Sequence, residues 1–315
     1  MAWSLVYPPI SAAPSVPQRI YAEFFNLRGI PFSITPDPEF LFLSDTHLAV
    51  LEKLQYGIKG LMGFMLLTGE VGTGKTTLCR ALLDKLEGRA RTVYVINPSL
   101  SGVELIACIL EDLGINCEAG ASKKELLDRL NGFLINHASA APVVIIIDDA
   151  QTMPRQTMED LRLLSNLETD KNKLLQIVLV GQPELMNLLE GPELRQLQQR
   201  IAIHCRLDFL GRDEIGAYIE RRLAVAGNQG QVRFTAKAAS RVYRLSNGVP
   251  RMINKLCDLA LTAAYAADSH LVDLAHVLAA HEELMGQRSW KSWLRRGWQA
   301  MPAVGPRSSG QGGLP

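Results

Sequence analysis

The sequence predicts an α/β fold in which a domain built on a parallel β-sheet is followed by a small all-α domain. Between residues 64 and 181, short apolar runs alternate with segments whose apolar residues recur at helical spacing. This alternation is typical of a parallel sheet covered by helices on both faces. After about residue 206 the strand patterns stop and only helical patterns follow. The run PVVIIIDD at 142–149 is rich in β-branched residues without a polar break, which indicates a central parallel strand.

The expected elements follow from these patterns. A helix starts with Asp45 or Thr46 as its cap and runs through 47–60. Strands are expected at 64–69, 92–98, 142–149 and 174–181, with helices at 76–88, 102–114, 123–138 and 158–168. Further helices are expected at 212–227, 235–248, 250–268 and 272–286. The predicted organisation is a flexible extension at 1–20, an aromatic and proline-rich linker at 21–44, the sheet domain at 45–205, the helical domain at 206–286 and a tail at 287–315.

Composition excludes several classes of protein. A hydrophobic content of 47% with 21% charged residues argues against disorder as the main state. The net charge of +1 provides no global basic field for nucleic acid, so we expect no nucleic-acid partner. No window holds the ~18 apolar residues of a membrane-spanning helix. The 5 cysteines are scattered and form no C-x-x-C pair, which fits a reducing cytoplasm better than a disulfide framework or a zinc site.

A phosphate-binding motif lies between the first predicted strand and the helix that follows it. Residues Gly69–Thr76 read G-x-x-x-x-G-K-T, the P-loop pattern. Its glycines let main-chain N–H groups point at phosphate oxygens, and the start of the helix adds its positive dipole end. Lys75 is expected to reach the β- and γ-phosphates of ATP, and the Thr76 hydroxyl to bind Mg²⁺. The predicted nucleotide-binding residues are Gly69, Glu70, Val71, Gly72, Thr73, Gly74, Lys75, Thr76 and Thr77.

Acidic residues end the central apolar strand. Asp148 is predicted to hold Mg²⁺ together with Thr76, and Asp149 to polarise the attacking water. The alternative for Asp149 is a cap on the segment that follows.

Beyond these motifs, the chain resembles a known family. GEVGTGKTTL, IIIDDAQ, IVLVGQPEL and GVPRMINKLCDLAL, with the aromatic opening at 21–58, are similar to the AAA+ ATPases of the general secretion pathway protein A (ExeA-like) family and to the related ATPase of mannose-sensitive pilus biogenesis. The resemblance covers about residues 21–285. It implies a P-loop AAA+ domain with a helical lid, ATP and Mg²⁺ as ligands, and assembly into a homo-oligomer, of which a hexamer is one form.

Further site residues come from this resemblance alone. It implies that Gln182 is the sensor-1 residue, that Arg200 is the arginine finger, with Arg195 as second choice, and that Arg251 is the sensor-2 residue. Two of these have a plain alternative: a polar turn residue for Gln182, and a solvated helix arginine for the arginine-finger position. The family usually has Glu where this chain has Asp149, so slow turnover or a nucleotide switch is also open.

Two segments outside the motifs raise separate possibilities. The aromatic opening, including Phe32, Pro36 and Phe40, either packs near the adenine or forms ordinary core. In the tail, Trp290, Trp293 and Trp298 fall on one helical face opposite basic residues, which is typical of a helix that lies on a membrane surface or docks on a partner. A segment packed back on the helical domain is the alternative.

Three functions are compatible with these features. The first is a cytoplasmic ATPase, peripheral on the inner membrane, that helps to assemble or operate a secretion, pilus or export apparatus. The second is a DNA-binding ATPase like the regulators of transposition, which the near-neutral charge disfavours. The third is a nucleotide-gated scaffold with little turnover, which Asp149 motivates.

Overall fold

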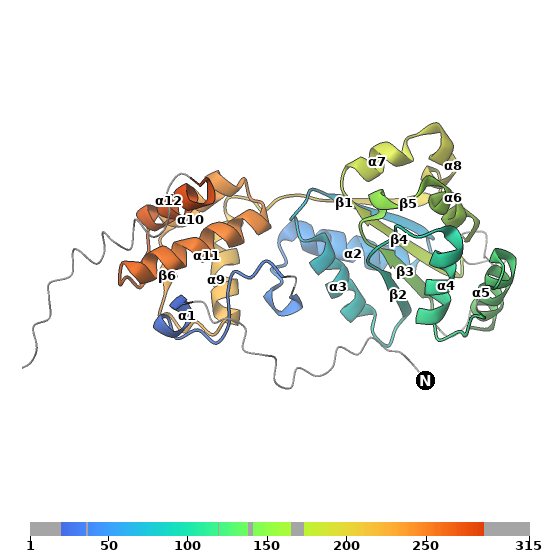
Figure 1. Cartoon of the computed structure of the whole chain (residues 1–315), viewed down its shortest axis with the longest axis horizontal. Coiled ribbons are helices and arrows are strands. Elements are labelled where there is room, and N and C mark those ends of the chain that lie inside the picture. The colour runs from blue at the N-terminus through green and yellow to red at the C-terminus, as the bar shows by residue number, and fades with distance from the viewer. Residues whose placement is uncertain (1–19, 36, 119, 138–140, 165–172, 287–315) are drawn as a thin grey trace, which may run out of the picture.

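A computed structural model describes residues 20–286 apart from residues 36, 119, 138–140 and 165–172. Of the predicted flexible extension at 1–20, residues 1–19 lie outside the described residues, whereas Ile20 belongs to a helix. The tryptophans of the tail, Trp290, Trp293 and Trp298, also lie outside the described residues. Figure 1 shows a sheet flanked by helices and, beside it, a second group made mostly of helices. Among the described residues, no helix combines the length and the apolar character needed to cross a membrane.

The sheet has five parallel strands in the order β2-β3-β4-β1-β5. They are β1 (Phe64–Gly69), β2 (Arg91–Val95), β3 (Val143–Ile147), β4 (Leu175–Gly181) and β5 (Ile201–Leu207). The sequence analysis missed β5. This strand lies at the edge of the sheet, and only Cys205 and Leu207 are fully buried in it, so it lacks the continuous apolar run of the central strands.

Alternating residues of each central strand bury opposite faces of the sheet. On one face, Phe64, Leu66 and Ile145 pack with apolar residues of α4 (Gly102–Asp112), α5 (Lys123–His137) and α6 (Arg155–Leu164). On the other, Met65, Leu67 and Val144 pack with α2 (Asp45–Lys59) and α3 (Lys75–Leu86). Burial on both faces explains why these strands are apolar throughout.

Short elements connect the later strands. They are the 3₁₀ turn η2 (Ala150–Thr152) after β3, then α7 (Glu184–Leu189), η3 (Pro192–Leu194) and α8 (Arg195–Gln198) between β4 and β5. At the start of α2, the cap is Ser44, whose hydroxyl accepts from the His47 N–H at 3.3 Å. The predicted caps, Asp45 and Thr46, were therefore wrong by one or two residues, because Ser44 also satisfies the preference for a small hydroxyl side chain.

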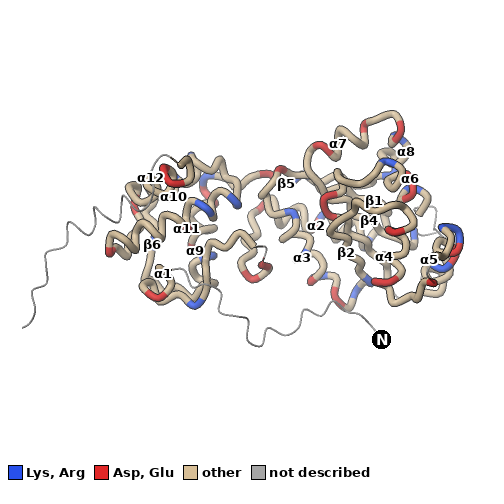
Figure 2. Tube along the Cα trace, viewed as in Figure 1, with Lys and Arg blue, Asp and Glu red and all other residues tan. Residues whose placement is uncertain are grey.

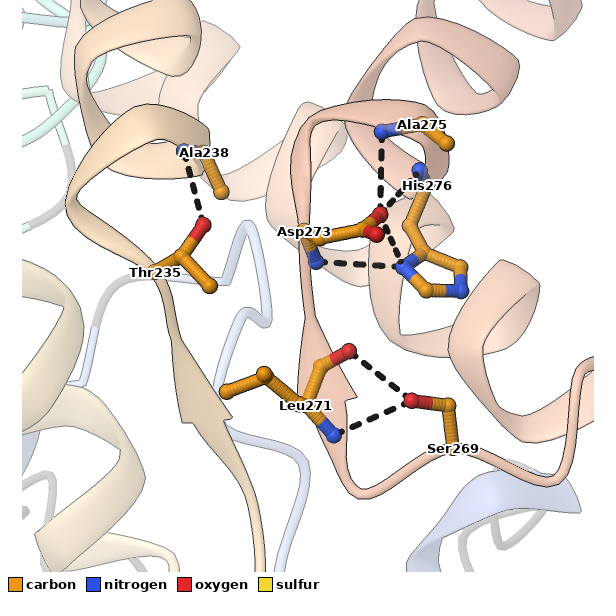
Figure 3. Close-up of polar contacts among 7 residues, drawn as sticks. All are labelled: Thr235, Ala238, Ser269, Leu271, Asp273, Ala275 and His276. Atoms are coloured by element: carbon orange, nitrogen blue, oxygen red, sulfur yellow. Dashed lines mark hydrogen bonds and ion pairs between the residues drawn. The ribbon is translucent and has the colours of Figure 1, made fainter.

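The second group contains α9 (Glu214–Val225), α10 (Ala236–Ser246), α11 (Pro250–Ala266) and α12 (Leu274–Leu284). It is not purely helical, because β6 (Arg233–Phe234) and β7 (Leu271–Val272) form a short parallel pair. Each of these strands leads into a capped helix (Figure 3). Thr235 caps α10 by accepting from the Ala238 N–H, and Asp273 and His276 form a capping box at the start of α12.

The aromatic N-terminal segment packs against these helices. It contains α1 (Ile20–Phe24) and the 3₁₀ turn η1 (Pro38–Phe40). Tyr21, Phe25 and Phe32 are buried in one cluster with residues of α9 and α11. Of the two possibilities raised for the aromatic opening, Phe32 is core, whereas Phe40 borders the cavity described below. Pro36 lies outside the described residues.

A buried arginine of α9 fastens this segment to the helices. The Arg222 guanidinium donates from Nε to the Pro31 carbonyl at 2.5 Å and from Nη2 to the Ser33 carbonyl at 3.0 Å. Its Cζ also lies 4.9 Å from the centre of the Phe40 ring. Hydrogen bonds from a charged donor to buried carbonyls are stronger than neutral ones and costly to lose.

We predict that Arg222→Met lowers the free energy of unfolding by about 2–3 kcal/mol, because buried carbonyls lose their donor. The matched control is Arg221→Met, whose side chain is exposed and makes a 3.4 Å contact with the Glu39 carbonyl. We expect it to change stability by less than about 0.5 kcal/mol. Urea unfolding without nucleotide measures both, and equal losses in the two variants would contradict the anchoring role.

Candidate functional site

A cavity of about 360 Å³ lies where the sheet, the helices and the N-terminal segment meet. Its volume is in the range of small-molecule sites. The sheet side contributes residues 71–77, Asp148, Asp149 and Gln182. The helical side contributes Leu210, Tyr218, Arg222, Pro250, Arg251 and Asn254, and the N-terminal side contributes Ser33, Ile34, Thr35, Asp37, residues 40–42 and His47.

The loop between β1 and α3 has the backbone that a phosphate cradle requires. Gly72 and Gly74 have φ angles of +84° and +99°, in the left-handed region that favours glycine. A Cβ at Gly72 would lie 2.9 Å from the Cβ of Arg251, so a side chain there would also collide with the helical part. Gly74 occupies the cap position of α3, whose free N–H groups face the loop. The loop therefore presents donors where an anion can approach closely.

Lys75 is the first residue of α3 and its side chain folds back over the loop. Its Nζ donates to the carbonyls of Gly69 at 2.6 Å and of Glu70 at 2.9 Å. Burial lowers the pKa of the amine, and the nearby carboxylates of Asp148 and Asp149 act in the opposite direction. Gly69 and Glu70 do not line the cavity, but they hold the amine beside it.

Asp148 follows β3 and is 3% exposed. One carboxylate oxygen, Oδ2, accepts from the Thr76 hydroxyl at 2.7 Å and from the Tyr94 hydroxyl at 2.9 Å. The other, Oδ1, accepts from the Asp149 N–H at 3.0 Å. Burial and the Asp148 charge raise the pKa of Tyr94, so this phenol stays protonated and remains a donor. The hydroxyl and carboxylate oxygens of Thr76 and Asp148 are the ligand types that Mg²⁺ prefers, so the residues present fit that ion.

Asp149 is exposed at the cavity wall and has a left-handed φ of +52°. It occupies the cap position of η2, yet its side chain makes no capping hydrogen bond. Instead, its Oδ1 accepts from Nε2 of Gln151 at 3.1 Å. The cap alternative for Asp149 is therefore not what the structure shows, and its carboxylate is available to the cavity.

The three residues taken from the family resemblance are placed differently. Gln182 and Arg251 line the cavity, the first at the end of β4 and the second in the first turn of α11. Arg200 does not line it: its Nη1 lies 3.4 Å from the Arg162 carbonyl, at the start of β5. Arg195, the second choice, is exposed on α8 and also away from the cavity. Neither arginine is placed to act in the cavity of its own chain.

Two residues that line the cavity, Tyr218 and Asn254, and two that lie beside it, Gln151 and Tyr94, were not predicted from the sequence. Tyr218 and Asn254 bond to one another at 2.8 Å, and the Asn254 amide donates to the Ser33 carbonyl at 3.2 Å. Gln151 and Tyr94 contact the two aspartates. Gln151 and Asn254 lie within the stretches IIIDDAQ and GVPRMINKLCDLAL, but nothing in the sequence gave either of them a role. Tyr94 and Tyr218 lie in none of the quoted motifs, because tertiary packing brings them to the site. His47 was also not predicted, although the sequence contains a signal for it. In Ser44-x-x-His47, a residue suited to capping a helix is followed one turn later by a polar side chain.

His47 links the start of α2 to the phosphate loop. Its Nδ1 lies 2.6 Å from the Ser44 Oγ, and its Nε2 lies 3.2 Å from the Thr73 carbonyl. Since a carbonyl only accepts, Nε2 carries the proton and Nδ1 accepts from the serine. Burial lowers the pKa of His47 from its usual 6.5, and the Thr73 hydrogen bond and Glu214 oppose this only in part.

We predict that His47 makes stability depend on pH below about 6.5. The unfolded chain takes up a proton there while the buried imidazole does not, so the free energy of unfolding decreases as the pH falls from 6.5 towards the lower folded pKa. Urea unfolding between pH 7.5 and roughly pH 5 should show a shallower dependence for His47→Gln than for wild type. His281→Gln, remote from the cavity, serves as the control. Identical slopes for wild type and His47→Gln would contradict the assignment.

Comparisons with known proteins agree with this geometry. The AAA domain family matches residues 59–189. The chain is 43% identical over 275 residues to general secretion pathway protein A of Aeromonas hydrophila, which covers 87% of this chain and 50% of that protein. The chain thus spans about half the length of this relative.

Solved structures with low sequence identity share the fold. The ORC1 protein of Aeropyrum pernix in complex with DNA superposes with a TM-score of 0.59 at 20% identity, covering 78% of this chain and 67% of that one. The Thermotoga maritima RuvB Holliday junction branch migration motor gives 0.52 at 21% identity, covering 75% and 69%. The chain thus contains a P-loop AAA domain with the fold of these structures, and it is similar to general secretion pathway protein A over half of that protein's length.

Proposed function

We propose that this chain binds ATP and Mg²⁺ in the cavity, hydrolyses the nucleotide, and works as an oligomeric ATPase in the assembly or operation of a secretion apparatus at the inner membrane. The observation that carries the proposal is the convergence of Lys75, Thr76, Asp148, Asp149 and Arg251 on one cavity from separate parts of the fold. A glycine-rich loop, oxygen ligands for a metal, an exposed carboxylate and a cation from the opposite wall form the set of groups that phosphoryl transfer requires.

Each residue has a distinct task in this proposal. Lys75 moves from the carbonyls of its own loop to phosphate oxygens, which compete for its amine as charged acceptors. Thr76 and Asp148 hold Mg²⁺, which when bound neutralises phosphate charge. Asp149 accepts a proton from the attacking water, and Gln182 and Arg251 contact the outer phosphate from the other walls.

Arg200 is proposed to act in a neighbouring subunit. Its side chain lies away from the cavity of its own chain, on the side formed by α8 and β5. An arginine supplied across a subunit contact stabilises charge on the transferring phosphoryl group. This role requires a homo-oligomer, and a hexameric ring is one form that places every Arg200 beside a neighbour's cavity.

The cellular role is supported by the 43% identity to general secretion pathway protein A. Lys, Arg, Asp and Glu are interspersed around both the sheet and the helices (Figure 2), in keeping with the net charge of +1. That distribution does not favour nucleic acid as the partner. A cytoplasmic protein held at the inner membrane through its secretion partners fits these features.

We predict that wild-type protein releases phosphate from ATP in the presence of Mg²⁺. Lys75→Ala and Asp149→Asn should lower this rate by about 100-fold or more, because they remove a phosphate contact and the proton acceptor. A colorimetric phosphate assay at saturating ATP measures the rates. Tight ATP binding by the wild type without release would instead support the nucleotide-gated scaffold.

A mixing experiment tests whether sites are shared between subunits. Arg200→Ala should be nearly inactive alone, since loss of an arginine finger costs about 10³-fold or more. Mixed with inactive Lys75→Ala, it should regain activity, because a Lys75→Ala subunit supplies Arg200 to a neighbour with an intact loop. Arg195→Ala is the control and should retain the wild-type rate. An inactive mixture, or a wild-type rate per chain that does not rise with protein concentration, would rule out the shared site.

A further inference from the structure

We infer that Gln151 is a positioning residue for hydrolysis, which orients the Asp149 carboxylate and couples it to the end of β4 at Gln182. This inference rests on the proposed function, because it names a further residue for that reaction. The neighbouring strands β3 and β4 carry Asp149 and Gln182 at their carboxyl ends.

The Gln151 side chain bridges these two strand ends. Its Nε2 donates to Asp149 Oδ1 at 3.1 Å, and its Oε1 accepts from the Gln182 N–H at 3.1 Å. The direction of the amide is determined by its partners, because a main-chain N–H only donates and a carboxylate only accepts. A primary amide is therefore required here: glutamate would place a second negative charge against Asp149, and an apolar side chain would make neither bond.

The space for this bridge depends on Gly181. A Cβ at that position would lie 2.6 Å from Gln151 Oε1 and 2.7 Å from Leu185 Cδ2. The φ of Gly181 is not in the left-handed region, so its glycine is explained by this close approach and not by backbone conformation. The absence of a side chain at Gly181 thus leaves room for the Gln151 amide at the end of β4.

The backbone of Asp149 is fixed independently of its side chain. Its N–H donates to Asp148, and its carbonyl accepts from the N–H and the hydroxyl of Thr152, both at 2.9 Å. With this backbone held at a left-handed φ, the hydrogen bond from Gln151 to Oδ1 orients the carboxylate. The other oxygen, Oδ2, remains to accept the proton of a water.

Coupling to β4 follows from the same two bonds. Gln182 lines the cavity on the side of the outer phosphate in the proposed mode of binding. A shift of the Gln182 main chain when ATP binds moves Oε1 of Gln151, which accepts from the Gln182 N–H. Nε2 of the same amide then moves the Asp149 carboxylate to which it donates. Gln151 thereby makes the position of the Asp149 carboxylate depend on the outer phosphate, the group that the water attacks.

The decisive variant is Gln151→Met, which is nearly isosteric but cannot make the bridge. We expect kcat for ATP hydrolysis to fall by about tenfold to 100-fold, because misplacing a catalytic group by about 1 Å has an effect of this size. The affinity for a fluorescent ATP analogue and the thermal midpoint should stay within about twofold and roughly 2 °C of wild type. Gln156→Met, on the exposed side of α6, is the matched control and should keep the wild-type kcat.

The second variant, Gln151→Glu, keeps the length of the side chain and one acceptor for the Gln182 N–H, but it cannot donate to Asp149 and repels its carboxylate. We expect kcat to fall at least as far as in Gln151→Met, while the affinity for the ATP analogue stays within about twofold of wild type. This split between kcat and affinity is the readout that a purely structural role would not produce.

The results separate this inference from the function on which it rests. An active wild type with unchanged kcat in Gln151→Met would overturn the role of Gln151 and leave the ATPase proposal intact. Equal losses in kcat, nucleotide affinity and thermal midpoint, or a wild-type kcat in Gln151→Glu, would also overturn it. A wild type without phosphate release would overturn both.

Discussion

The site depends on one geometric constraint: all five strands of the sheet are parallel, so their carboxyl ends lie along the same edge. β1, β3 and β4 lie within the order β2-β3-β4-β1-β5, and each ends in a different part of the site. β1 leads into the phosphate loop, β3 into Asp148 and Asp149, and β4 into Gln182. The arrangement is only stable because both faces of the sheet are buried, which accounts for the unbroken apolar character of the central strands.

The other walls of the cavity depend on buried polar contacts and not on apolar packing alone. Arg222 ties the main chain near Ser33 to α9, and Asn254 of α11 reaches the same carbonyl. His47 connects the cap of α2 to the Thr73 carbonyl of the phosphate loop. A peptide unit has its C=O and N–H on opposite sides, so holding this carbonyl on the His47 side turns the following N–H the other way. The walls and the loop are thus held by directional bonds, which suits a site that must fit a polyanion.

Sequence patterns were sufficient for four of the five strands, the phosphate loop and the two aspartates, because those features are encoded locally. Glycine at positive φ, a lysine at the first turn of a helix and acids after an apolar strand are short-range signals. β5 was missed because an edge strand buries few residues and His204 and Arg206 interrupt its apolar pattern. Arg222 and Gln151 were missed because their partners are remote in the sequence or belong to the main chain.

The cap of α2 illustrates a smaller limit of sequence reasoning. Ser44, Asp45 and Thr46 all have side chains suited to capping, so the sequence could not choose among them. The choice of Ser44 brings His47 to the buried side of the helix, 3% exposed and within reach of the phosphate loop.

The central claim is that the loop residues and Asp148 form one site for nucleotide and Mg²⁺. The most direct measurement is calorimetric titration of a slowly hydrolysed ATP analogue into wild type and Thr76→Val, each with Mg²⁺ and with EDTA. The account predicts one saturable site per chain, weakened by EDTA in the wild type and nearly insensitive to EDTA in Thr76→Val, since the variant lacks the hydroxyl that joins Asp148 at the metal position. Absence of saturable binding, or the same response to EDTA in both proteins, would contradict it.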